Sequence, residues 1–302
     1  MNPISTAADL IDVLECPICG SSSNEPFESL DESDRAITYR LCSNCGTVFQ
    51  SPRMTDDSLK SYYEAEYVSQ HQQATGVTEK ELRIQAGRAR HLVQMLKAEV
   101  AAVERHLDVG SSTGSLMLAI KGEYGNEAIG IEPAKVYRAY CATRGLTVIP
   151  DLESLSNGPF DLITMAHVVE HLPDPVNYLQ EVREEWLTPE GMLLVEVPNL
   201  YGHRSVEIPH LFCFSAGTLR YTLAQAGYEV IRMQRHGSPR SRLIPLYITA
   251  IARPVGESPA AKSTPRAVRF KRKSGMAWSQ IASRIAPGLA WLPLPSLEGE
   301  PE

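Results

Sequence analysis

The sequence predicts an α/β fold in which a mostly parallel sheet is flanked by helices and preceded by a small metal-binding module. Apolar runs alternate with helical patterns between residues 106 and 251, which is typical of strands joined by helices. A loop of serines and glycines joins the first run to the helix that follows it. Two Cys-x-x-Cys pairs precede this whole region.

Length and composition narrow the class of protein. A chain of 302 residues with 43% hydrophobic and 22% charged residues is ordinary for a globular protein of about two domains. The net charge of −7 does not favour nucleic acid as a partner. We expect neither a signal peptide nor a membrane span, because no basic leader and no apolar run of sufficient length is present. The expected location is the cytoplasm, with reduced thiols.

The first module, residues 1–52, contains the two cysteine pairs. Cys16 and Cys19 form one pair, Cys42 and Cys45 form the other, and each pair is followed by a glycine that permits a tight turn. This spacing predicts a four-cysteine zinc site, and residues 36–41 read as a strand leading into the second pair. The module is therefore predicted to be a zinc ribbon with a structural metal. A redox disulfide pair and chance spacing are the alternatives.

A connection and a helix lead from this module to the sheet. Tyr62, Tyr63 and Tyr67 recur at helical spacing, and we expect them to pack between ribbon and core or else to line a substrate mouth. Residues 78–103 read as a helix with one apolar face, expected to lie against the sheet beside the ligand site.

The stretch from residue 107 to residue 132 predicts a nucleotide-binding unit. It reads as strand, small-residue loop, helix, strand and acid. Asp108, Gly110, Ser112 and Gly114 shape the loop, which allows a ligand to approach the backbone closely. Glu132 stands at the tip of the second strand, where an acid can accept hydrogen bonds from ribose hydroxyls. A structural turn in another kind of α/β protein is the alternative.

Further strands and helices complete the predicted sheet. Helices are expected at 133–144, 176–187 and 218–227. Five further strands are expected, at residues 146–149, 160–166, 192–197, 228–231 and 243–251. Together with the two strands of the stretch 107–132 they make seven.

The motif D-x-G-x-x-x-G followed by an acid resembles that of class I S-adenosylmethionine (SAM)-dependent methyltransferases, with Ser112 in place of a usual glycine. Residues 160–199 resemble the ubiquinone-biosynthesis O-methyltransferases within that class, and the module CPICG…CSNCG is similar to that of sugar C-methyltransferases. The resemblance covers about residues 80–252. It implies a Rossmann-like seven-stranded sheet within a SAM-dependent methyltransferase domain at 53–253, whose last two strands are antiparallel.

The same resemblance implies roles for individual residues. Asp151 would meet the adenine amino group, although a surface turn is the competing interpretation, and His167 would line the methionine arm of the cofactor. His171 would face the acceptor, and His210 lies in a segment similar to the family's H-x-x-x-F-S element. Either histidine is a candidate general base. Glu170 and His171 also match an E-x-x-E-H pattern that is thought to hold a divalent ion in the ubiquinone branch.

The tail, residues 254–302, differs in composition. A basic stretch that includes Lys262 and Arg266 precedes Trp278, Ile281 and Ile285, which repeat at helical spacing. Such a segment suits an anionic membrane surface or a partner groove, and the alternative is a tail with one helix docked on the core.

The predicted function is therefore SAM-dependent methyl transfer to a small-molecule acceptor, with a sugar or glycan hydroxyl preferred. The alternatives are a zinc-ribbon RNA methyltransferase or nucleic-acid-binding protein, and a non-catalytic SAM-binding scaffold. The tail is basic, so the remainder of the chain is more acidic than the whole, which argues against the nucleic-acid alternative.

Overall fold

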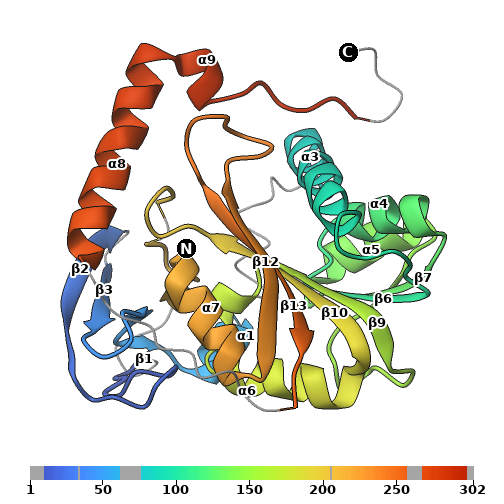
Figure 1. The fold of residues 1–302 in the computed structure, drawn as a ribbon, viewed down its shortest axis with the longest axis horizontal. Helices are drawn as coiled ribbons and strands as arrows, with labels where there is room; N and C mark the ends of the chain where they lie inside the picture. Colours follow the sequence, from blue (N-terminus) through green and yellow to red (C-terminus); the bar gives the residue numbers. More distant parts are fainter. Residues whose placement is uncertain (1–9, 33–34, 62–75, 205, 257–266, 298–302) are drawn as a thin grey trace.

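The computed structural model describes residues 10–32, 35–61, 76–204, 206–256 and 267–297. Two larger sheets, one of seven strands and one of four, account for most of the strands within these ranges (Figure 1). Tyr62, Tyr63 and Tyr67 of the predicted connection lie outside the described residues, as do Lys262 and Arg266 of the tail.

The seven-stranded sheet confirms the predicted α/β fold. Its strands, in spatial order, are β12 (Tyr228–His236), β13 (Tyr247–Pro254), β10 (Leu187–Pro198), β9 (Phe160–Ala166), β6 (Arg105–Val109), β7 (Glu127–Ile131) and β8 (Thr147–Ile149). The five strands from β10 to β8 run parallel to one another. β13 is antiparallel to both of its neighbours, as the resemblance implied for the last pair.

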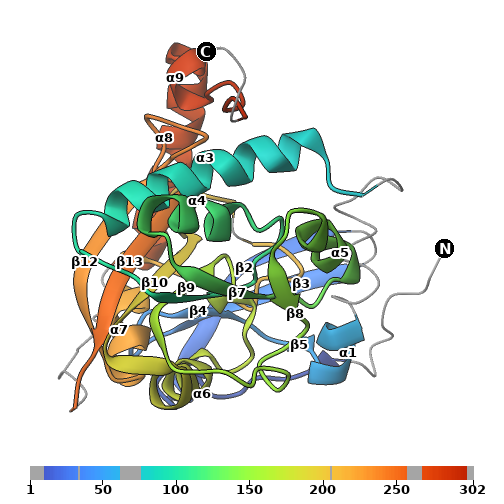
Figure 2. The ribbon, with the colours of Figure 1, turned by 90° about the vertical axis from the view of Figure 1, so that its right-hand side faces the viewer.

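Helices cover both faces of this sheet (Figure 2). α3 (Glu79–Leu96), α4 (Ser115–Tyr124) and α5 (Lys135–Thr143) lie over one face, while α6 (Pro175–Glu181) and α7 (Ala216–Gln225) lie over the other. Consecutive strand residues point to opposite faces, so Leu162 packs in the cluster under α3 and α4, whereas Ile163 packs in the cluster on the α6 and α7 side. Both faces are thus apolar, as expected for parallel strands covered on both sides.

Several element boundaries differ from the prediction; β10 and β12 are each about five residues longer than expected. α3 begins at a capping box formed by Thr78 and Glu81, but it ends at Leu96 because the next residues turn toward β6. The helix expected at 176–187 is the short α6 followed by a five-residue π turn, η4 (Val182–Trp186). β13 starts four residues later than expected because the hydroxyl of Ser241 accepts the backbone N–H groups of Leu243 and Ile244 in a turn.

The four-stranded sheet joins the N-terminal module to the loop after β10. Its strands, in spatial order, are β11 (Phe212–Cys213), β4 (Val48–Gln50), β3 (Arg35–Cys42) and β2 (Asn24–Glu32). The hydroxyl of Tyr39 on β3 donates a hydrogen bond of 2.9 Å to the carbonyl of Glu207 and bonds the carbonyl of His210. Cys16 and Phe49 share one apolar cluster with strands of the large sheet. The domain boundary at residue 52 remains a prediction.

Short elements complete the described chain. β1 (Leu10–Ile11) pairs with β5 (Arg53–Met54), α1 (Asp56–Ser61) follows, and a 3-10 turn, η3 (Val169–His171), lies after β9. The tail forms α8 (Val268–Ile285) and α9 (Pro287–Ala290), which run along one flank of the molecule (Figure 1). Among the helices of the described residues, none combines the length and apolarity that crossing a membrane requires.

Candidate active site

A pocket of about 600 Å³ opens where the parallel strands end. Ligands of open α/β sheets bind outside the carboxyl ends of the strands. Seven of the nine predicted cofactor and catalytic residues line it, namely Asp108, Gly110, Ser112, Glu132, Asp151, His167 and His171. Gly114 and His210 are not among the lining residues.

The loop after β6 has a left-handed backbone at three of the predicted positions. Gly110, Ser112 and Gly114 have φ values of 74°, 47° and 70°. A Cβ at Gly110 would lie 2.5 Å from a methyl carbon of Val168, and one at Gly114 would lie 2.3 Å from Cδ1 of Leu146. Only glycine fits both the conformation and the space at these two positions. Gly110 therefore forms the pocket wall, whereas Gly114 shapes the turn beneath it.

Two buried acids stand at the strand ends. Glu132 accepts the backbone N–H groups of Ser112 at 3.0 Å and of Ala134 at 2.8 Å, one on each carboxylate oxygen. Burial raises the pKa of Glu132 despite these bonds. Asp108 accepts the hydroxyl of Thr164 at 2.6 Å, and burial raises its pKa to about 7. Each Glu132 oxygen keeps acceptor capacity, so this residue fits a ribose diol in the pocket.

Asp151 follows β8 and is exposed at the pocket rim. Its Oδ1 accepts the backbone N–H of Ser154 at 2.9 Å and the hydroxyl of the same residue at 2.6 Å. The carboxylate therefore holds a turn, as the competing interpretation expected, and it also faces the pocket. Its contact with an adenine stays a prediction.

His167 is held between two buried glutamates. Its φ is 60°, Nδ1 lies 3.2 Å from Oε1 of Glu170, and Nε2 lies 3.4 Å from Oε1 of Glu196. Burial and the nearby Arg88 disfavour the charged ring, but the attraction of the two carboxylates outweighs them and raises the pKa of His167. The pKa of Glu170 is lowered to about 2, because its pairing with His167 and the other nearby histidines outweighs the effect of burial.

The ionic group around Glu196 was not predicted from the sequence. This fully buried residue of β10 pairs with Nε of Arg88 at 2.9 Å and with Nε2 of His236 at 3.2 Å, and it accepts the hydroxyl of Thr249 at 2.9 Å. Pairing with His167 and His236 lowers the pKa of Glu196 although burial opposes this. The only sequence signal was an acid inside the apolar run of β10.

The two candidate bases are neighbours. The rings of His171 and His210 are 4.9 Å apart between centroids, in an edge-to-face arrangement. Nδ1 of His171 is 2.9 Å from the carbonyl of Pro209, and because a carbonyl only accepts, Nδ1 carries the hydrogen. Burial lowers the pKa of His171 to about 4, so its ring is neutral at pH 7. Donor atoms of Glu170, His171 and His210 all lie within 4.8 Å of one another, close enough for the alternative of a shared ion.

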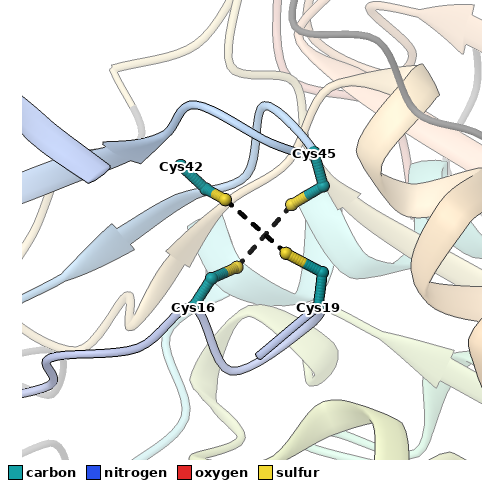
Figure 3. Close-up of side chains that lie close together, drawn as sticks. All are labelled: Cys16, Cys19, Cys42 and Cys45. Atoms are coloured by element: carbon teal, nitrogen blue, oxygen red, sulfur yellow. Dashed lines mark hydrogen bonds between the residues drawn. The ribbon is translucent and has the colours of Figure 1, made fainter. Parts of the chain in front are cut away.

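The four cysteines of the N-terminal module converge on one point (Figure 3). Their sulfur atoms lie within 4.8 Å of one another, with 3.6 Å between the sulfurs of Cys16 and Cys45 and the same between those of Cys19 and Cys42. A tetrahedral zinc with bonds near 2.3 Å separates its sulfurs by roughly 3.8 Å. Hydrogen bonding to Cys16 lowers the pKa of the Cys45 thiol to about 5, so one thiolate forms readily. The residues fit a zinc ion.

Comparisons with known proteins agree with this fold. Residues 81–233 match the methyltransferase domain family. The fold is similar to that of the 1,6-didemethyltoxoflavin N1-methyltransferase of Burkholderia thailandensis, at 18% identity and a TM-score of 0.54, covering 76% of this chain and 99% of that one. A SAM-dependent methyltransferase of Archaeoglobus fulgidus is 17% identical, with a TM-score of 0.46 over 58% of this chain and 100% of that one. A SAM-dependent methyltransferase of Clostridium acetobutylicum is 12% identical, with a TM-score of 0.45 over 57% of this chain and 92% of that one. Curated proteins give no match.

Proposed function

We propose that this chain, which belongs to the methyltransferase domain family and is a SAM-dependent methyltransferase, passes the methyl group to a hydroxyl of a sugar or glycan. The observation that carries the choice of a hydroxyl is the neutral, buried imidazole of His171 in the wall of the pocket. Hydrogen-bonding side chains suited to a polyhydroxyl acceptor line the rest of the pocket, among them Asp56, Gln85, Arg88 and Glu181.

SAM supplies a methyl group already activated on a sulfonium sulfur. Glu132 would receive the ribose hydroxyls, Asp151 the adenine, and Gly110 with Ser112 would allow the cofactor to lie close to the backbone. His167 would flank the methionine arm. The pairing with Glu170 and Glu196 raises the pKa of this histidine and so favours its protonated form, which suits the carboxylate of an amino acid.

The acceptor proton would pass to Nε2 of His171, since Nδ1 is committed to Pro209. Oε1 of Glu170 lies 3.9 Å from that Nε2 and would stabilise the imidazolium as it forms. His210 is the second candidate base. It lies beside His171 and does not line the pocket, so it would take the acceptor proton by way of His171. If His171, His210 and Glu170 hold a divalent ion instead, the ion would supply Lewis-acid activation of the acceptor, and His171 would serve as its ligand and not as a base.

Zinc at Cys16, Cys19, Cys42 and Cys45 would be structural, because four thiolates leave no open coordination position. Such an ion would contribute on the order of 10 kcal/mol to the folding of the ribbon. We infer a reducing compartment such as the cytoplasm, in which cysteine ligands of zinc stay reduced.

The test is a screen of sugars, glycans and metabolite extracts with methyl-labelled SAM, run beside His171→Asn. Label transferred to a hydroxyl by the wild type and lost in the variant supports the proposal. Transfer to nitrogen or carbon would refute the hydroxyl acceptor, and cofactor binding without transfer to any acceptor would favour the scaffold alternative. Retention on RNA that falls steeply with salt would favour the nucleic-acid alternative.

A further inference from the structure

The inner face of α8 fixes this helix on the body of the protein. Nη1 of the buried Arg272 donates to the carbonyls of Leu200 and His203, both at 2.6 Å. The backbone at Gly275 lies so close to the loop that a Cβ there would be 1.9 Å from the carbonyl oxygen of Tyr201. This face is therefore already occupied. On the neighbouring side, Phe270, Lys271 and Trp278 border an open hollow between α8 and the body, and their side chains remain exposed.

The outer face of α8 carries a strip of large apolar side chains. The exposed fractions are 71% for Phe270, 44% for Trp278, 49% for Ile281 and 71% for Ile285. At about 100° per residue these four side chains fall within roughly 80° of the helix circumference. A helix that packs by one face and leaves such a strip uncovered on the other indicates a contact outside the chain.

Cations border this strip on both sides. By the same helical geometry Lys271 lies beyond one edge of the strip, and Lys273 and Arg284 lie beyond the other; all three are exposed. α8 contains no Asp or Glu. Arg269 is not counted among these cations, because its charge is paired with Glu25, with Nη2 3.0 Å from Oε1.

The apolar surface continues past α8. Leu289, Trp291 and Leu294 are also exposed. Nε1 of Trp278 donates to the carbonyl of Leu243 at 3.1 Å, and Nε1 of Trp291 donates to the hydroxyl of Ser283 at 2.8 Å, so each indole N–H is satisfied within the protein. α8 and α9 stand at the edge of the molecule, where an extended surface can reach them (Figures 1 and 2).

We propose that the outer face of α8, continued by α9 and residues 291–294, binds the surface of a bilayer that contains anionic lipids. An apolar strip between two rows of cations matches the order of acyl chains and headgroups at such a surface. The charge is complementary, since this acid-free helix belongs to a chain whose net charge is −7. Nucleic acid would use the cations but not the exposed isoleucines. The inference does not depend on the identity of the methyl acceptor.

The test is flotation of the full-length protein with vesicles of phosphatidylcholine alone and of phosphatidylcholine with phosphatidylserine. The wild type should float with the anionic vesicles and remain below with the neutral ones, and added salt should weaken the binding. The emission of the exposed tryptophans should shift to shorter wavelength on the anionic vesicles. No flotation with anionic vesicles, or equal flotation with both kinds, overturns the proposal.

Two variants and a matched control locate the surface. The double variant Phe270→Ser/Ile285→Ser and the double variant Lys271→Gln/Lys273→Gln should each reduce vesicle affinity by about tenfold or more. Leu14→Ser removes an equally exposed apolar side chain, at 74% exposure, from the ribbon and should bind as the wild type does. Unchanged SAM affinity shows that each variant is folded. The proposal is overturned if both double variants float as the wild type does. It is also overturned if the wild type is a dimer that does not bind vesicles and the double variants are monomers, since a second copy of the chain then covers the strip.

Discussion

The backbone N–H of Ser112 donates a hydrogen bond of 3.0 Å to Oε2 of Glu132, which ties the loop after β6 to the end of β7. The predicted cofactor acid therefore also holds the predicted cofactor loop in its left-handed conformation. Replacing Glu132 should affect ligand binding by two routes, through the lost ribose contact and through the released loop.

Glu132→Ala should weaken binding of S-adenosylhomocysteine by roughly 10–100-fold, because it removes hydrogen bonds to a charged group worth about 1.5–3 kcal/mol. Calorimetric titration measures this effect. Glu127→Ala, an exposed acid at the opposite end of the same strand, is the control and should bind normally. An affinity unchanged by Glu132→Ala would remove this residue from the site.

The pair Gly110→Ala and Gly125→Ala separates backbone strain from lack of space. Both glycines have φ above 70°, but a Cβ at Gly125 meets nothing within 4 Å, whereas one at Gly110 meets Val168. Each variant should lose about 1–2 kcal/mol of unfolding free energy through strain. Only Gly110→Ala should also lose cofactor affinity, by about tenfold or more, since Val168 must move in the pocket wall. Urea unfolding and calorimetry give the two quantities, and equal affinity in both variants would contradict the prediction.

The acid limb of the pH–rate profile should lie near pH 4. His171 acts as a base only when neutral, and burial lowers its pKa to about 4, so it stays competent as the pH falls from 8 to about 5 and is lost below that. His171→Asn should lower kcat by about a hundredfold or more. The measurement is the rate of methyl transfer to the acceptor found in the screen, from pH 4 to pH 9. An acid limb near the ordinary histidine pKa of about 6.5 would point to another base.

Cys42→Ser should lose bound zinc and melt at lower temperature. Removing one of four thiolates forfeits several of the roughly ten kcal/mol that the ion contributes to folding. Metal content by atomic emission and Tm by calorimetry measure the two effects, and a chelator should reproduce them in the wild type. Cys141→Ala removes a thiol outside the cluster and should keep its zinc. The prediction is wrong if the purified wild type contains no zinc and its Tm does not change when a chelator is added.

Local patterns explain what the sequence could predict. The strand before Gly110, the acid at 132 and the four cysteines each depend on spacing within a few residues or on hydrophobic period, and the structure brings those residues together as expected. The pairing of Arg88 with Glu196 joins residues on α3 and β10 that are far apart in the chain, and no local pattern predicts it. The same holds for β11, a two-residue strand that depends entirely on its partner β4.

The pairing of β11 with β4 has a consequence for how the enzyme would respond to its surroundings. His210 lies just before β11, the outermost strand of the four-stranded sheet, and its carbonyl accepts a hydrogen bond from Tyr39 on β3. If the four cysteines hold zinc as proposed, depriving the cell of zinc would loosen the support of His210 and its neighbours while Glu132 and the glycine loop stayed in place. The starved enzyme would still take up its methyl donor but would turn over slowly, so that metal supply would govern methylation.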